Sequence, residues 1–210
     1  MIGCIFIFIK VKNINKTVSL YLIISSIVML YISIFDLIPS AFNYLNKIYD
    51  FMSSIKILTI YVLFGGIFVC TIDKLNQNSN KLYKIGLLSA ISLIIHNIPE
   101  GIITFVTSSY DISLGLSFAF TIALHNIPEG IVISIPIYYG EKSKRKAIIY
   151  TLIAALSEPF GAFLAFLLFH NINIYLFSII LSITSGIMLY LSIFGLLFEG
   201  IFYKKKKDVV

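Results

Sequence analysis

The hexapeptide HNIPEG occupies residues 96–101 and recurs at residues 125–130, within the apolar stretch LIIHNIPEGIITFVTSSYDISLGLSFAFTIALHNIPEGIVISIPIYYG (residues 93–140). Each copy places a histidine, an asparagine and a glutamate among aliphatic side chains. Ionisable groups are costly in such surroundings unless they are paired or bind an ion. The repeat therefore indicates a polar site inside a hydrophobic bundle.

The composition of the whole chain is that of a membrane protein. Hydrophobic residues make up 59% of the 210 positions and charged residues only 12%, whereas soluble domains carry about 25% charged residues. A helix needs about 20 apolar residues to cross a bilayer, and short connections separate the segments that reach this length. The sequence predicts an all-α, polytopic transmembrane bundle that forms one domain over residues 1–210. Its six predicted spans are residues 18–42, 54–72, 85–108, 113–139, 147–169 and 174–200.

The first nine residues, MIGCIFIFI, are apolar but too few to cross a membrane. They would form about 14 Å of helix before Lys10, roughly half of what a crossing needs. A signal-like segment and an interfacial anchor are alternatives. We favour a partial span that precedes the six full ones.

The basic residues indicate how the chain is oriented in the membrane. On the predicted topology, one side holds only Lys47 and Lys56, so 14 of the 16 lysines and arginines lie on the other side. The positive-inside rule places that lysine-rich side, with the C-terminus, in the cytosol. The membrane is either the plasma membrane or an internal organelle membrane. The net charge of +6 is then explained by topology and by contact with the lipid bilayer, without a nucleic-acid partner.

The spacing within HNIPEG suits a metal ion. Histidine and glutamate are four residues apart, which brings them to one face of a helix, where an imidazole and a carboxylate can share a divalent ion. The proline has no N–H, so it frees the carbonyl four residues earlier, Ile95 or Leu124, and bends the helix. Irregular backbone of this kind marks ion sites in membrane transporters.

The two copies are also placed to meet. If spans 85–108 and 113–139 form an antiparallel hairpin, His96 lies at the depth of Glu129 and Glu100 at the depth of His125. Both pairs are centred between residues 112 and 113, beside a polar turn at Ser109 to Asp111. We therefore expect each histidine to face the glutamate of the other copy near the middle of the membrane.

A third carboxylate and two amides complete the candidate site. Glu158, in LSEPFGAF, again precedes a proline inside an apolar run, and Asn97 and Asn126 follow the two histidines. A lone intramembrane histidine is more often a helix contact than a ligand. Three charged carboxylates, however, would cost about 7 to 10 kcal/mol in lipid, so a cation or protons must offset them. The predicted metal or proton site comprises His96, Asn97, Glu100, His125, Asn126, Glu129 and Glu158.

Three other polar residues have simpler interpretations. Asp36, in IFDLIPSAF, lies near the outer end of the first full span, where it is either an interfacial carboxylate or an entrance ligand that attracts cations. His170 lies at the outer boundary of its span and is interpreted as interfacial. Glu199, beside the KKKK run, is interpreted as solvated or salt-bridged.

These motifs resemble the ZIP (Zrt/Irt-like) family of divalent-metal transporters, especially its bacterial zinc-uptake branch. The likeness is strongest from LIIHNIPEG through LSEPFGAFLAFLL (residues 93–168) and weaker in IVMLYISIFDLIPSAF and SITSGIMLYLSI. In total it covers roughly residues 25–200. The resemblance implies transport of metal toward the cytosol, with one helical bundle sliding against another.

The resemblance also implies a two-metal site. The first metal would be held by His96, Glu100, His125 and Glu129. The second would be held by Asn97, Glu100, Asn126, Glu129 and Glu158, with Glu100 and Glu129 bridging the two ions.

The chain departs from the family pattern in three ways. Relatives typically have eight spans with both ends outside, whereas here the first span is partial and the eighth is lacking after KKKKDVV. We expect either a truncated gene model or a homodimer in which a second copy completes the bundle. Phe194 and Gly195 replace an acidic pair of the seventh span, and the loop DKLNQNSNKLYK carries no histidine.

The sequence thus predicts a permease that carries Zn²⁺ or Fe²⁺ into the cytosol as cargo and has no cofactor. Imidazole and carboxylate ligands suit both metals. Two alternatives remain open. The first is a degenerate relative with a structural or regulatory role. The second is an intramembrane metal hydrolase, against which the absence of an HExxH helix argues.

Overall fold

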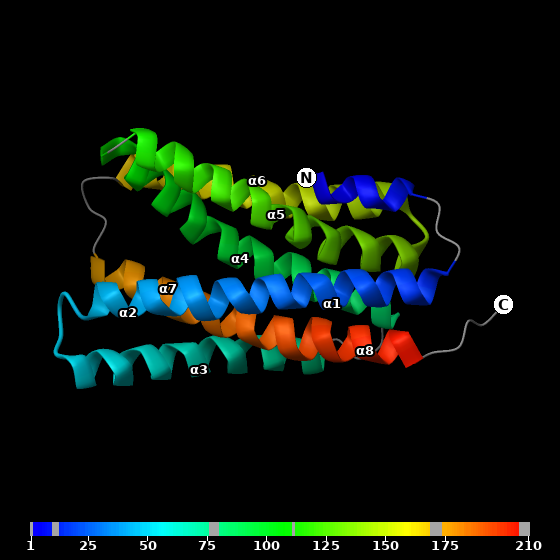
Figure 1. The fold of residues 1–210 in the computed structure, drawn as a ribbon, viewed down its shortest axis with the longest axis horizontal. Coiled ribbons are helices and arrows are strands. Elements are labelled where there is room, and N and C mark those ends of the chain that lie inside the picture. Colours follow the sequence, from blue (N-terminus) through cyan, green and yellow to red (C-terminus); the bar gives the residue numbers. More distant parts are fainter. Residues whose placement is uncertain (1, 10–12, 76–79, 111, 169–173, 206–210) are drawn as a thin grey trace.

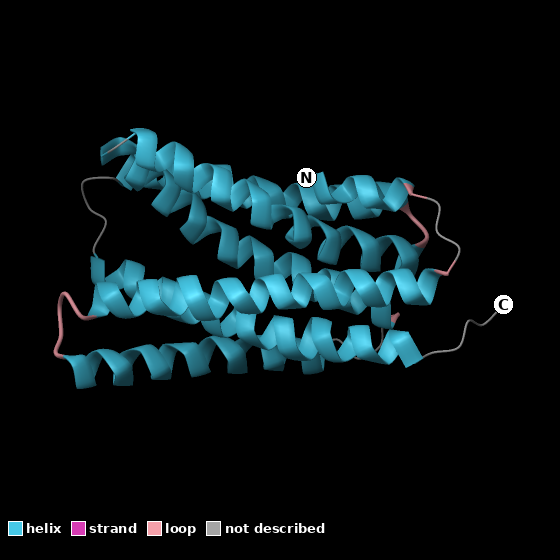
Figure 2. Cartoon of the chain, in the orientation of Figure 1, coloured by secondary structure: helices cyan, strands magenta, loops and turns pink. Residues whose placement is uncertain are grey.

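The structure is a computed structural model that describes residues 2–9, 13–75, 80–110, 112–168 and 174–205. Within this part, the side chains of a few residues, His125 among them, are not described. The described residues form helices and short connections and contain no strand (Figure 2). The helices are η1 (Ile2–Phe8), α1 (Ile14–Ile32), η2 (Ser33–Leu37), α2 (Ile38–Leu45), α3 (Phe51–Leu75), α4 (Lys81–Tyr110), α5 (Ile112–Glu141), α6 (Lys144–Leu168), α7 (Ile174–Tyr190), η4 (Leu191–Leu197) and α8 (Phe198–Lys205).

The predicted all-α membrane architecture is confirmed at the level of helices that can cross a bilayer. Five stretches of the described residues are long and apolar enough: Ile14–Leu45, Phe51–Lys74, Lys81–Val106, Lys144–Leu167 and Ile174–Lys205. The predicted spans 18–42 and 174–200 end too early, because α1 with α2 and α7 with α8 form continuous helices through π-helical turns, η2 and η4.

The helices separate into two bundles that lie side by side (Figure 1). In the first, α4 packs against α5 and α6, and η1 packs on α5. In the second, α3 and α2 pack against α7, and α1 packs against η4 and α8. Contacts of α1 with α5, and of α4 with α7 and η4, join the bundles. The repeated hexapeptides lie on α4 and α5, so the candidate site belongs to the first bundle.

The predicted hairpin is confirmed. Helix α4 ends at Tyr110 and α5 begins at Ile112, close to the expected turning point, and the two helices pack against each other. Both remain helical through the prolines of the repeat, Pro99 and Pro128. The motif therefore interrupts neither helix.

Glycines allow α4 and α6 to touch backbone to backbone. A Cβ atom added to Gly101 would lie 1.9 Å from the carbonyl oxygen of Glu158, and one added to Gly161 would lie 2.1 Å from that of Ile98. Such distances are far below van der Waals contact, so only glycine fits at either position. Small residues permit this close approach of membrane helices, and here they bring Glu158 beside the first hexapeptide.

The second bundle uses the same device between α3 and α7. A Cβ on Gly65 would lie 2.1 Å from the carbonyl oxygen of Ile183, and one on Gly186 would lie 1.9 Å from that of Val62. Reciprocal glycine contacts thus bring α4 close to α6 in the first bundle and α3 close to α7 in the second.

The N-terminal segment is a short 3₁₀ helix, η1, that packs on α5. Ser134 donates a hydrogen bond to the carbonyl of Gly3 at 3.3 Å, and Cys4 and Ile7 are buried. Seven residues at about 2.0 Å rise give roughly 14 Å. This segment is therefore too short to cross a membrane, as expected from its sequence.

Candidate metal site

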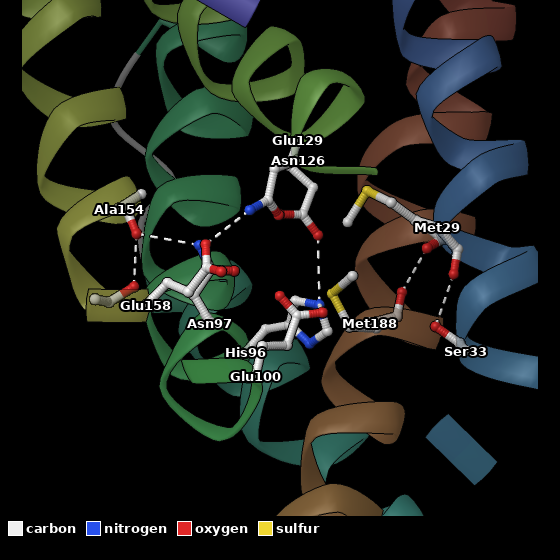
Figure 3. Close-up of polar contacts among 12 residues, drawn as sticks. Met29, Ser33, His96, Asn97, Glu100, Asn126, Glu129, Ala154, Glu158 and Met188 are labelled. Carbon is white, nitrogen blue, oxygen red and sulfur yellow. Dashed lines mark hydrogen bonds and ion pairs between the residues drawn. The ribbon is translucent and has the colours of Figure 1, made fainter. Parts of the chain in front are cut away.

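His96 stands at the centre of the candidate site. Its side chain is 0% exposed, and its Nε2 lies 3.1 Å from Glu100 Oε1 on the next turn of α4. The same nitrogen lies 3.4 Å from Glu129 Oε1, which α5 contributes from the second hexapeptide (Figure 3). The predicted meeting of a histidine with the glutamate of the other copy is therefore confirmed for His96 and Glu129. The reciprocal pair involves His125, whose side chain lies outside the described part.

The two asparagines tie the site to α6. Asn97 Nδ2 donates to the backbone carbonyl of Ala154 at 3.1 Å, and Asn126 Nδ2 donates to Glu158 Oε2 at 2.8 Å (Figure 3). Each bond uses a hydrogen of the amide nitrogen and leaves the amide oxygen without a described partner. The Oδ1 atoms of Asn97 and Asn126 are buried and have no hydrogen-bond partner among the described residues. Both are available as neutral oxygen ligands.

Among the described side chains of the site, the negative charges outnumber the positive ones. Glu100 and Glu129 are 7% and 3% exposed and share one imidazole, which carries at most one positive charge. Neither oxygen of Glu129 has a hydrogen-bond partner in the described part of the chain. Buried carboxylates are strongly destabilising when their pairing is incomplete, as it is for Glu129 among the described residues. A divalent cation would neutralise them, and their oxygens are the donors that such an ion takes.

The site lies between two small cavities. The first, of about 40 Å³, is lined by Asp36, Ser40, His96, Glu100 and Thr184 together with apolar side chains. Asp36 is exposed and His96 is fully buried, so this cavity connects the surface at η2 with the imidazole. The predicted entrance position of Asp36 thus lies in the same cavity as two of the candidate ligands.

The second cavity, of about 30 Å³, lies on the other side of the site. Its lining includes Asn97, Asn126, Glu129 and Thr151. On α4 it reaches Leu93, one turn nearer the start of the helix than the residues that line the first cavity. Together the two cavities flank the contact between His96 and Glu129.

The described side chains are not arranged around a common ion position. No three or more His, Cys, Asp and Glu residues among them form a set that could hold a metal ion as placed. In this arrangement His96 Nε2 contacts one oxygen of each carboxylate, at 3.1 Å from Glu100 and 3.4 Å from Glu129. A metal ion would therefore have to replace the contacts between His96 Nε2 and the carboxylates.

Two polar features near the site were not expected from the sequence. Ser25 of α1 donates to the carbonyl of Pro128 at 3.3 Å, which joins the second bundle to the repeat itself. Thr184 of α7 lines the first cavity. Hydroxyl residues in apolar helices give no periodic signal, and only the packing of the two bundles identifies these two.

The remaining sequence interpretations fall at the ends of the bundle. Of the two interpretations of Glu199, solvated or salt-bridged, the second is confirmed. Its Oε2 atom lies 2.9 Å from Nζ of Lys81 on α4. A second ion pair joins Lys84 of α4 to Asp73 of α3 at 2.8 Å. His170 lies outside the described residues.

Comparison with known proteins gives a consistent result. The sequence model of the family described as ZIP zinc transporter matches residues 75–209. The chain is 40% identical to the zinc transporter ZupT of Streptococcus mutans and 38% identical to that of Oceanobacillus iheyensis, over 93% of this chain and 81% of each relative. It is 34% identical to the zinc transporter ZupT of Campylobacter jejuni, over 99% of this chain and 85% of the relative.

Proposed function

The chain belongs to the ZIP family of zinc transporters, and from that premise we propose that it moves Zn²⁺ into the cytosol through the site formed by the two HNIPEG copies and Glu158. Transport, rather than the hydrolysis considered from the sequence, is the activity of this family's members. The observation that carries the site assignment is the buried contact of His96 with Glu100 and Glu129, at 3.1 and 3.4 Å.

The proposed ligands are those named from the sequence: His96, Asn97, Glu100, His125, Asn126, Glu129 and Glu158. Two observations support this set. The amide nitrogen of each asparagine is held by a hydrogen bond to α6, and the buried amide oxygens have no described partner and can bind an ion. Glu158 is held at the site by Asn126 and by the glycine contact between α4 and α6. Such a set of nitrogen and oxygen donors accepts Zn²⁺ and also Fe²⁺, so we propose Fe²⁺ as a second cargo.

The proposed path uses both cavities. Zn²⁺ enters past Asp36, exchanges water for ligands at His96 and Glu100, and leaves through the cavity beside Asn97 and Glu129. This direction places the Asp36 end outside the cytosol. The helix ends that carry Lys74, Lys81 and Lys144 lie together at the opposite end of the bundle (Figure 1). The positive-inside rule supports the assignment of that end to the cytosol.

We further propose that α5 is a sixth span and that residues 1–210 form one membrane domain. Helix α5 has 30 residues, or about 45 Å of helix, and packs along α4. A span at this place is required if the lysine-rich connections are to share one side of the membrane.

Uptake of radioactive zinc into proteoliposomes tests the proposed function. The variants are Glu100→Gln and Glu129→Gln, which keep the shape of the side chain and remove its charge. Glu141→Gln is the matched control, because Glu141 pairs with Lys146 at the end of α5, away from the site. We expect uptake by the wild type and the control, and loss of uptake in both site variants. Background uptake by the wild type would favour a degenerate relative, and full uptake by the site variants would contradict the site.

A further inference from the structure

Thr184 carries a buried hydroxyl that no described residue of the protein binds. The residue is 1% exposed, and its Oγ1 atom has no hydrogen-bond partner among the described residues. A buried hydroxyl without a partner destabilises a folded protein, because it gives up its hydrogen bonds to water and gains none in return. A buried polar group without a partner in a native protein often has a functional role, such as contact with an ion or a water.

Other hydroxyl residues of α7 behave differently. Ser178, Ser182 and Ser185 each donate to a backbone carbonyl three or four residues earlier, at 2.7 to 2.8 Å. Serine and threonine hydroxyls in membrane helices usually find their hydrogen-bond partner in this way. Thr184 lies between Ser182 and Ser185 in the chain and makes no such bond in the described structure.

The location of Thr184 supplies the explanation. It lines the cavity that joins Asp36 and Ser40 to His96 and Glu100. A volume of about 40 Å³ holds roughly three water-sized particles. Apart from these five residues, the lining consists of Leu37, Pro99, Ile103, Ile122 and Leu181. Thr184 is therefore the one polar side chain that α7 contributes to this lining.

We propose that Thr184 is a positioning residue for the transported ion, and this rests on the proposed transport function. Its hydroxyl oxygen contacts the divalent cation, or a water that the cation retains, as the ion passes from Asp36 to His96 and Glu100. The contact comes from the second bundle, whereas His96 and Glu100 belong to the first. The ion is thus held from both sides of the interface between the bundles.

The chemistry of the contact determines its effect. An ion that leaves Asp36 loses water between apolar walls, and one neutral oxygen replaces part of that hydration without adding charge. Oxygen is a hard donor, which Zn²⁺ accepts more readily than the softer Cd²⁺ does. Loss of the hydroxyl should therefore weaken the capture of Zn²⁺ more than that of Cd²⁺.

Kinetics of zinc uptake by the full chain in proteoliposomes test the inference, with Thr184→Val as the main variant. Valine keeps the shape of threonine and removes the hydroxyl. We expect its KM for Zn²⁺ to rise about 3- to 10-fold, which is the effect of one lost polar contact, with a smaller change for Cd²⁺. Thr184→Ser restores the hydroxyl and should recover the wild-type KM to within about 2-fold.

Two controls separate this role from packing. The first control is Ser182→Ala, which removes a buried hydroxyl of α7 whose described hydrogen bond goes to the backbone carbonyl of Ser178. The second control is Ser92→Ala. Its buried hydroxyl has no described partner, and the residue lines neither cavity of the site. Both should keep the wild-type KM. Thermal unfolding in detergent is measured for all four variants. If Thr184 were only structural, Thr184→Val would unfold at the wild-type temperature or above, with unchanged KM.

The outcomes distinguish the two proposals. If the wild type takes up zinc, and Thr184→Val has the same KM and the same preference for Zn²⁺ over Cd²⁺, then the proposed role of Thr184 is wrong and the transport function stands. A KM raised equally in Thr184→Ser would also contradict that role, because the hydroxyl would then not be the relevant group. Absence of uptake by the wild type would overturn the transport function and with it the role of Thr184.

Discussion

His96 Nε2 lies 3.4 Å from Glu129 Oε1, although the two residues belong to different copies of the repeat and to antiparallel helices. This contact shows that α4 and α5 are in register, with equivalent motifs at one level. The same register explains why Asn97 and Asn126 line one cavity with Glu129. The metal affinity and the stability of the protein should depend on this register and on the contacts around it.

Substitution of His96 by alanine should weaken zinc binding. The imidazole is the only fully buried nitrogen ligand described at the site. Substitution of the groups that orient a metal ligand typically lowers affinity by about 10- to 100-fold, so loss of the ligand itself should lower it by at least that much. Equilibrium dialysis of the detergent-solubilised protein measures this affinity. His170→Ala is the control, since that histidine is expected at the membrane boundary. Equal affinity of His96→Ala and the wild type would contradict the assignment of His96.

Gly161→Ala should destabilise the first bundle. The added Cβ would lie 2.1 Å from the carbonyl oxygen of Ile98, so α4 and α6 must separate, and such overpacking costs about 1 to 3 kcal/mol. Thermal unfolding in detergent measures the change. Gly66→Ala is a matched control, because its Cβ would meet the carbonyl oxygen of Gly186 at an ordinary 3.6 Å. The control should be neutral or slightly stabilised.

Asp73 and Lys84 should show measurable coupling. Their ion pair, at 2.8 Å with side chains 32% and 23% exposed, joins the two bundles at the lysine-rich end. Pairs of this exposure contribute up to about 1 kcal/mol. A double-mutant cycle with Asp73→Asn and Lys84→Met, followed by chemical unfolding, measures the coupling energy. Strictly additive effects of the two substitutions would show that the pair contributes nothing to stability.

Asp50 should stabilise the start of α3 in a pH-dependent manner. Its carboxylate accepts hydrogen bonds from the backbone N–H groups of Met52 and Ser53, both at 3.1 Å, and hydrogen bonds from Ser53 and Met52 lower its pKa from the usual 3.8. A lowered folded-state pKa means that the stabilisation is present above 3.8 and is lost as the pH falls through the folded value.

The corresponding experiment compares wild type with Asp50→Ala by thermal unfolding at several pH values. The difference should be largest near neutral pH and should shrink below pH 3.8. An Asp50→Asn variant can still cap the helix through its amide oxygen, so this control should lose the pH dependence while it retains much of the stability. A pH-independent difference for Asp50→Ala would show that the carboxylate charge is not involved.

Much of this architecture could be predicted from one repeated hexapeptide. The apolar segments imply membrane helices, and the spacing of the two copies implies a hairpin with His96 opposite Glu129. Both inferences depend only on local periodicity and on the position of the turn. The assignment of Glu158 to the site depended on its charge in an apolar run, and its hydrogen bond with Asn126 agrees with that prediction.

Contacts between helices distant in sequence could not be predicted in the same way. The chain has 12 glycines, and the local sequence does not show which of them lie in close contact with another helix. Gly161 is in close contact with the backbone of α4, whereas a Cβ on Gly66 would fit at an ordinary distance from α7. The role of Thr184 likewise depends on how the second bundle faces the first. The ion pair of Glu199 with Lys81 joins residues far apart in the sequence, and charge alone did not identify the partner.

The π-helical turn η2 fixes the direction in which α2 faces. A π turn accommodates one residue more than an α turn, and one residue corresponds to roughly 100° of rotation. Pro39, just after the turn, has no N–H for the carbonyl of Phe35, which makes the regular α pattern unfavourable here. Removal of a single residue from this turn would rotate the helix beyond it by about that angle. Ala41 and Leu45, now fully buried, would turn away from their present neighbours. Asp36, at the surface end of the first cavity, would lose its alignment with the imidazole of His96.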